Sequence, residues 1–103
     1  KRPRGGQAMR LLLWYQGIYR HMKRIERVQT GLRLEKRLLK VLKGLAEHLD
    51  MSTADLIEGM ALHALEGKAP FSEATLEKIE MLKQVYDLDL TAEDSHRLRE
   101  EGE

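Results

Sequence analysis

The apolar residues between Val28 and Leu65 change their spacing abruptly, and this change limits the folds open to the chain. From Val28 to Leu34, apolar or β-branched residues alternate with polar residues and a glycine, which is typical of a strand with one buried face. From Glu35 onwards the apolar residues recur every three or four positions, as in an amphipathic helix. The sequence therefore predicts one short strand followed by helices, a mainly α fold.

Capping residues divide the helical part. A first helix is predicted over residues 35–49, and Ser52 is predicted to cap a second helix that stops at Gly67. Additional C-terminal helices are predicted after Ser72 and, as a short turn, after Thr91. The residues expected to form the core of the strand and the first two helices are Leu32, Leu34, Leu38, Leu42, Leu45, Leu56, Ile57 and Met60.

Three regions are predicted along the 103 residues. Residues 1–21 are expected to form a basic arm and a helical extension whose apolar stripe continues to about residue 27, residues 22–67 the central domain, and residues 68–103 an acidic helical extension. The central domain has fewer than 50 residues and would bury too little apolar surface to fold alone, so a partner chain is expected. There are no cysteines, which excludes disulfides and thiolate chemistry.

The two ends of the chain carry opposite charge. Residues 1–43 hold 13 lysines and arginines against 2 acids, a balance of +11, whereas residues 44–103 hold 5 against 15, a balance of −10. The basic end suits a polyanion, and the acidic end would repel one. We therefore expect the acidic segment from Phe71 onwards to face away from any bound nucleic acid.

The order of these elements resembles the ribbon-helix-helix family of Arc-like and methionine-repressor-like DNA-binding proteins. The similarity covers Gly31 to Ile57 in apolar pattern and element length, and it includes the pairs Leu32-Arg33, Leu38-Leu39 and Ala46-Glu47 and the helix cap Ser52. The resemblance implies an intertwined homodimer in which two strands, one from each chain, form a two-stranded antiparallel ribbon that enters the DNA major groove. The core residues given above would then form a dimer core that both chains share.

The resemblance also implies which residues would contact DNA. Gln29, Gly31 and Arg33 would face the bases; arginine can pair with guanine and glutamine with adenine, whereas Gly31 has no side chain to read a base. The amides that begin the second helix would hold a phosphate, because unpaired donors and the positive end of the dipole meet there. The residues expected to contact phosphates are Ser52, Thr53, Ala54, Arg27, Lys36 and Arg37.

These expectations favour a sequence-specific transcriptional repressor that binds double-stranded DNA as a homodimer in the bacterial cytoplasm, associated with the nucleoid when bound. A second hypothesis is an antitoxin whose acidic C-terminal helices bind a toxin protein. A third is an all-helical module without the strand, whose basic half binds RNA or an acidic protein. Stability of the C-terminal region to proteolysis separates the first two.

Other functions find little support in the sequence. We predict no enzyme, because there is no glycine-rich phosphate loop, no nucleophile motif and no distinctive acid/base pair. The four histidines are not spaced as ligands on adjacent turns, so no metal and no cofactor are predicted. No apolar run has the length of a membrane-spanning helix.

Overall fold

The computed structural model describes residues 22–102, and the chain divides after Gly31 into two units that are described separately. Residues 22–31, the described part of the first unit, are exposed and lie in neither a helix nor a strand. The predicted helical extension over residues 1–21 lies outside the described residues, and its expected continuation to residue 27 is wrong. The elements of the second unit are α2 (Lys36–His48), α3 (Thr53–Leu65), α4 (Glu73–Val85) and the 3-10 turn η2 (Ala92–Asp94).

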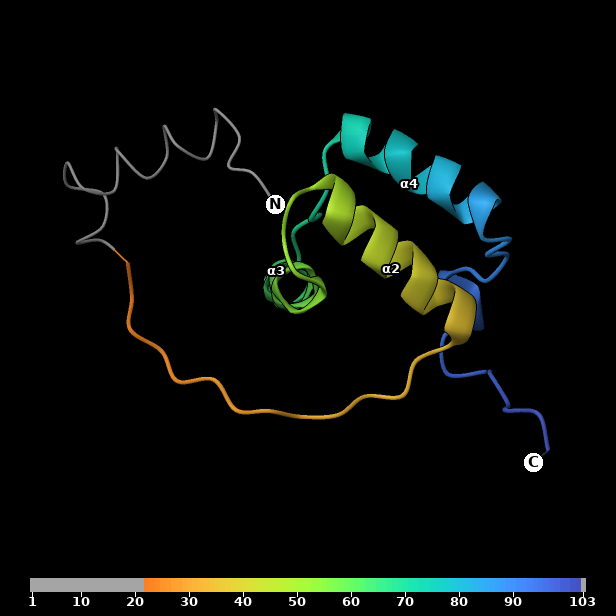
Figure 1. Cartoon of the computed structure of the whole chain (residues 1–103), viewed down its shortest axis with the longest axis horizontal. Coiled ribbons are helices and arrows are strands. Elements are labelled where there is room, and N and C mark those ends of the chain that lie inside the picture. Colours follow the sequence, from red (N-terminus) through yellow and green to blue (C-terminus); the bar gives the residue numbers. More distant parts are fainter. Residues whose placement is uncertain (1–21, 103) are drawn as a thin grey trace. The chain divides into compact units, whose positions relative to one another are not determined.

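The predicted strand is wrong. Between residues 22 and 102 the structure contains helices and turns but no strand, so the antiparallel ribbon of the predicted fold is not seen. Residues 28–34 instead form an exposed segment that leads into α2 without coiling (Figure 1). Alternation of apolar residues gives a strand only when a neighbouring strand supplies the ladder of hydrogen bonds, and the helical unit offers none. The fold of the described chain is helical.

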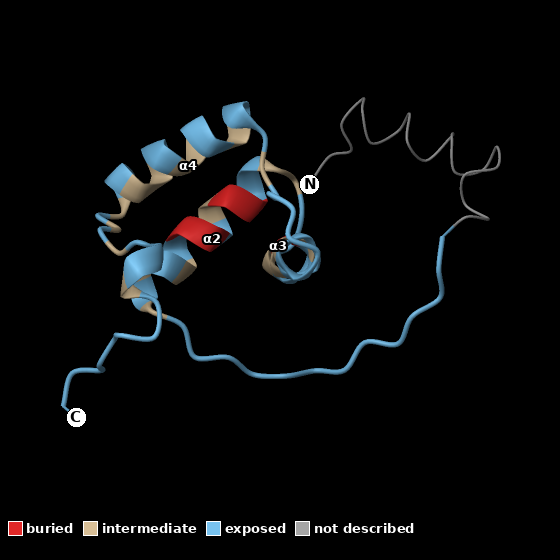
Figure 2. Cartoon of the chain, turned by 180° about the vertical axis from the view of Figure 1, so that it is seen from behind, coloured by how far each residue is buried: buried red, intermediate tan, exposed pale blue. Residues whose placement is uncertain are grey.

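The helix α2 lies at the centre of the second unit and packs against both α3 and α4. Figure 1 shows α4 running antiparallel beside α2, with α3 seen end-on because it crosses α2 steeply. Among residues 22–102, four of the five buried apolar residues lie on α2, the helix that carries the red positions in Figure 2, and Leu56 of α3 completes the set. The buried residues of α2 are Val41, Leu42, Leu45 and Ala46.

Each helix begins at a side chain that accepts a hydrogen bond from a backbone amide of the first turn. Glu35 accepts from the amide of Leu38 at 2.8 Å, and Ser52 accepts from that of Asp55 at 3.0 Å. Ser72 caps α4 through the amide of Thr75 at 3.2 Å. These bonds satisfy donors that a helix cannot pair internally, which fixes where the three helices start.

The helices also end alike, each with a residue in the left-handed backbone region. At the end of α3 this residue is Gly67, with a φ of 73°, and the amide of Lys68 bonds back to the carbonyl of His63. Asp50 and Asp87 take the same place after α2 and α4, with φ of 61° and 55°. Such ends turn the chain sharply, so the helices can fold back on one another.

Gly44 allows α4 to approach α2 closely. A β-carbon at this position would lie 3.1 Å from a terminal methyl group of Leu82, a tight contact. The absence of a side chain therefore sets the distance between the two helices.

No helix in the described range 22–102 is long and apolar enough to cross a membrane.

Candidate nucleic-acid interface

Five basic residues of the second unit lie at the start of α2 and along its polar side. Lys36, Lys40 and Lys43 are spaced four and three positions apart, so they share one side of the helix, and all three are exposed. We call the set Arg33, Lys36, Arg37, Lys40 and Lys43 the basic face. Arg37 is half-buried and the other four residues are exposed, and the Lys40 ammonium lies 6.0 Å from the ring centre of Tyr86, the residue that ends α4.

Arg37 is the most constrained member of the basic face. Its Nε donates to the Glu35 carboxylate at 3.1 Å, and its Nη1 donates to the carbonyl of Asp87 at 2.9 Å. The Leu38 amide, together with the nearby Arg37 guanidinium, lowers the pKa of Glu35. In turn, the hydrogen bond to Glu35 raises the pKa of Arg37. Both groups are therefore charged across the neutral range, and Glu35 serves the helix cap rather than the surface.

The acidic C-terminal residues contact the basic face. Glu100 accepts from Arg33 at 2.6 Å, and Asp89 pairs with Arg37 at 3.1 Å. The acidic C-terminal region, expected to face away from bound DNA, therefore contacts the basic residues at these two positions. The opposite charges of the two halves of the chain were the sequence signal for this contact.

The residues predicted to hold a phosphate at the second helix lie where they were placed, at the N-terminus of α3. Ser52 is the cap, Thr53 and Ala54 are the first two helical residues, and Ser52 and Ala54 are exposed. Asp55 follows in the first turn, and its negative charge opposes an anion there. This end adjoins the C-terminus of α2, so the length of α2, roughly 20 Å, separates it from Arg33.

The other predicted contact residues, Arg27, Gln29 and Gly31, belong to the first unit and are exposed. A β-carbon at Gly31 would meet nothing within 4 Å, so packing does not require glycine at this position. The structure brings together Arg33, Lys36 and Arg37 at one end of α2.

The residues predicted for a dimer core fall into three groups. Leu42, Leu45 and Leu56 are buried within the single chain, and Ile57 and Met60 are packed partly against them. Leu32, Leu34 and Leu38 are exposed, at 66%, 39% and 36%. The last group lies at or just before the start of α2, so this end of the unit carries apolar and basic side chains together.

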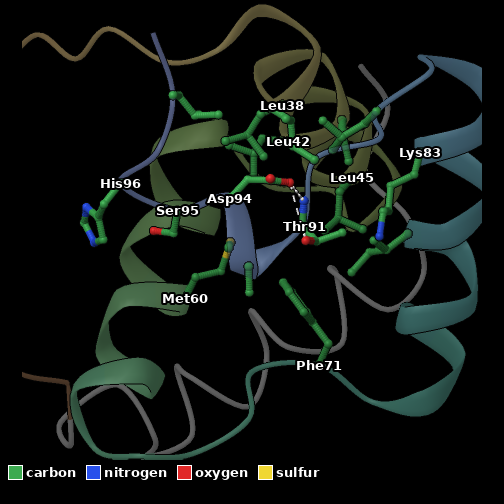
Figure 3. A pocket seen from close by; sticks show the side chains of 16 residues that line it. Leu38, Leu42, Leu45, Met60, Phe71, Lys83, Thr91, Asp94, Ser95 and His96 are labelled. Carbon is green, nitrogen blue, oxygen red and sulfur yellow. Dashed lines mark hydrogen bonds between the residues drawn. The ribbon is translucent and has the colours of Figure 1, made fainter.

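A cavity of about 460 Å³ opens between α2 and the residues that follow α4 (Figure 3). Leu38, Leu42 and Leu45 line one side, and Met60 and Phe71 lie across from them in the view. Asp94 is one of the polar residues that line the cavity. The Asp94 carboxylate accepts a hydrogen bond from the Thr91 amide at 2.8 Å and so caps the short turn η2. Sequence patterns gave no sign of this cavity, since its lining comes from all three helices and the C-terminal residues.

No cluster of three or more possible metal ligands occurs among residues 22–102. The ring Nδ1 of His63 lies 2.7 Å from the carbonyl oxygen of Gly59 on the same helix.

Comparisons with protein-family models, with curated proteins and with solved structures returned no match. The function of this protein is therefore inferred from its own residues and their geometry.

Proposed function

We propose that the chain is a transcriptional regulator that binds double-stranded DNA as a homodimer. The observation that supports this most directly is the basic face: four of its five residues are exposed, and Glu35, the only acid between Arg33 and Lys43, caps α2 and pairs with Arg37. Lysines and arginines placed along a helix neutralise phosphates and release the counterions that surround DNA. The basic face supplies this non-specific part of the affinity.

Specific recognition is assigned to Arg33. Its side chain is 83% exposed and stands before the rigid start of α2, so the guanidinium can reach beyond the helix. A guanidinium presents paired donors that match the two acceptors of guanine in the major groove. The amides of Thr53 and Ala54 add donors for a phosphate.

A second copy of the chain is expected because the single chain leaves much apolar surface uncovered. Only five apolar residues are buried in the described range, which is a small core for a unit of this length. Leu62 and Leu65 on α3 are 66% and 84% exposed, and Leu32 before α2 is 66% exposed. Pairing with a second copy would cover these side chains and double the cationic surface offered to DNA.

The test measures binding to a fluorescent duplex of mixed sequence over a range of salt concentrations. Wild-type protein should bind, with affinity that falls steeply as salt rises. Lys36→Ala should reduce the slope of log affinity against log salt by about one, because one phosphate contact is lost. Arg33→Ala should weaken binding to a preferred site by roughly 1 to 3 kcal/mol while helical content stays unchanged.

Lys68→Ala is the matched control, because it removes an exposed lysine after α3 and leaves the basic face intact. It should bind DNA like the wild type. Equal losses in the Arg33, Lys36 and Lys68 variants would show that only net charge matters. Failure of the wild-type protein to bind any duplex at low salt would rule out the proposal.

The absence of a strand favours a second candidate, a helical module whose basic half binds RNA or an acidic protein. The same assay separates the candidates when unlabelled duplex DNA, duplex RNA, single-stranded RNA and an acidic polypeptide are added as competitors. Duplex DNA should compete best if the proposed function is right. Stronger competition by RNA or by the polypeptide would favour the second candidate.

The antitoxin hypothesis is less well supported by the packing of α4. Ile79 and Leu82 of that helix pack against the buried core, and Leu82 also contacts Gly44 of α2. A helix used in this way is part of the fold and offers less of its apolar stripe to a toxin. The exposed apolar residues left on α4 are Leu76, Met81 and Val85.

A further inference from the structure

The two arginines of the basic face are occupied by the chain's own acidic residues. Arg33 pairs with Glu100 across 67 positions of sequence, and Arg37 binds both the Asp89 carboxylate and the Asp87 carbonyl. We call residues 87–100 the C-terminal segment. Its three acceptors, two carboxylates and a carbonyl, take the places that phosphate oxygens would take on these guanidinium groups.

These ion pairs are exposed to solvent and can therefore be broken readily. The side chains of Arg33 and Glu100 are 83% and 58% exposed, and Asp89 is 79% exposed, so water and salt compete for each pair. Leu90 and Leu98 of the C-terminal segment line the cavity of about 460 Å³ together with the leucines of α2, so part of their apolar surface packs against no other atoms. A segment over a cavity has fewer contacts to lose when it moves away.

The connection between the segment and α2 makes the competition effective. Asp87 follows the C-terminal end of α4, and α4 is held against α2 by Leu82, so the acidic groups remain close to the arginines at any protein concentration. A tethered competitor acts at a high local concentration. Weakly charged or poorly placed anions would therefore fail to displace it, whereas the dense charge of duplex DNA would succeed.

We propose that the C-terminal segment is autoinhibitory: Asp89 and Glu100 compete with DNA phosphates and bases for Arg37 and Arg33, and the segment must leave for the protein to bind. This inference rests on the proposed DNA-binding function and adds a regulator of the same surface. It assigns the acidic end of the chain a role that its charge alone would make unfavourable near DNA.

The test compares the double variant Asp89→Asn/Glu100→Gln with the control Glu77→Gln/Glu93→Gln. Both remove two acidic charges, but Glu77 and Glu93 are exposed acids that contact neither arginine in the described chain. The first variant should bind a mixed-sequence duplex about three- to tenfold more tightly than wild type at low salt, and the control less than about twofold. The difference should shrink as salt rises.

A measurement on the DNA-free protein tests the contact itself. Hydrogen exchange of the Arg33 and Arg37 guanidinium protons, followed by NMR, should be faster in the Asp89/Glu100 variant than in the wild type and the control. Equal gains in affinity for both variants, or no gain for the first, would overturn the autoinhibition while leaving DNA binding intact. If no variant binds any duplex, the proposed function fails and the inference fails with it.

Discussion

Glu35 holds the start of α2 through a charged cap. Its carboxylate accepts from the Leu38 amide, and this bond is the main cause of its lowered pKa. A carboxylate whose pKa is lower in the folded state contributes stability above its ordinary value of 4.5, and that contribution disappears as pH falls through the folded-state pKa. Glu35→Gln should therefore reduce the free energy of unfolding at neutral pH, and this loss should be smaller at an acidic pH well below 4.5.

Urea unfolding of wild type and Glu35→Gln at both pH values measures this difference. Glu77→Gln is the control, because it removes an exposed carboxylate of α4 that caps no helix. It should not reproduce the loss seen with Glu35→Gln at neutral pH. A Glu35→Gln effect of the same size at both pH values would mean that the shape of the side chain, and not its charge, holds the cap.

At the scale of elements, the N-terminus of α3 can be tested without disturbing the helix. Thr53 is the first helical residue, and the extended backbone of Ser52, with ψ of 158°, is compatible with a following proline. Thr53→Pro should fold with stability within about 1 kcal/mol of wild type, because proline is well tolerated at this position. It removes one amide donor, so duplex affinity should fall about tenfold if that amide binds a phosphate.

The equivalent change in α4 provides the control. Glu73 is the first residue of α4, and Ser72 before it has nearly the same backbone geometry, with ψ of 168°. Glu73→Pro should therefore fold equally well and bind DNA at least as tightly as wild type. Unchanged duplex affinity for Thr53→Pro would remove the N-terminus of α3 from the proposed interface and leave the basic face as its remaining part.

The helices were predictable because their signals are local. The spacing of Leu38, Leu42 and Leu45 and the caps Ser52 and Ser72 depend on residues within a few positions of each other, and all three helices lie where the sequence places them. The strand was not predictable in this way. A strand needs a partner elsewhere in space, and alternation over residues 28–34 does not reveal whether one exists.

For the whole molecule, the proposed function predicts a homodimer whose interface covers the exposed side of α3. Leu65 is 84% exposed, so Leu65→Glu should leave the fold of the chain intact, as checked by circular dichroism. Sedimentation should show wild type as a dimer and Leu65→Glu as a monomer, because a buried charge without a partner destabilises an interface. Weaker DNA binding should accompany the loss of the dimer.

Val85→Glu on α4 is the matched control, since Val85 is 66% exposed and lies on a different helix from Leu65. It should remain dimeric. Wild-type protein that sediments as a monomer at all concentrations tested would contradict the homodimer. Loss of the dimer in both variants would mean that the interface extends over α4 as well.

The candidate site was predicted only in part. The composition of residues 1–43 indicates a surface for a polyanion, and Arg33, Lys36 and Arg37 do lie together at one end of α2. The contacts of Asp89 and Glu100 with this surface were not predicted, because they join residues more than 50 positions apart through the packing of α4. Charge asymmetry shows that such contacts are favourable but not which residues make them.

The central claim is that this chain recognises double-stranded DNA, and selection of bound duplexes from a random pool tests it most directly. The selection should enrich a sequence with two symmetry-related half-sites and with guanine at the positions that Arg33 contacts. The affinity for this sequence should fall steeply as salt rises. Folded protein that enriches no sequence and binds no duplex at low salt would contradict it.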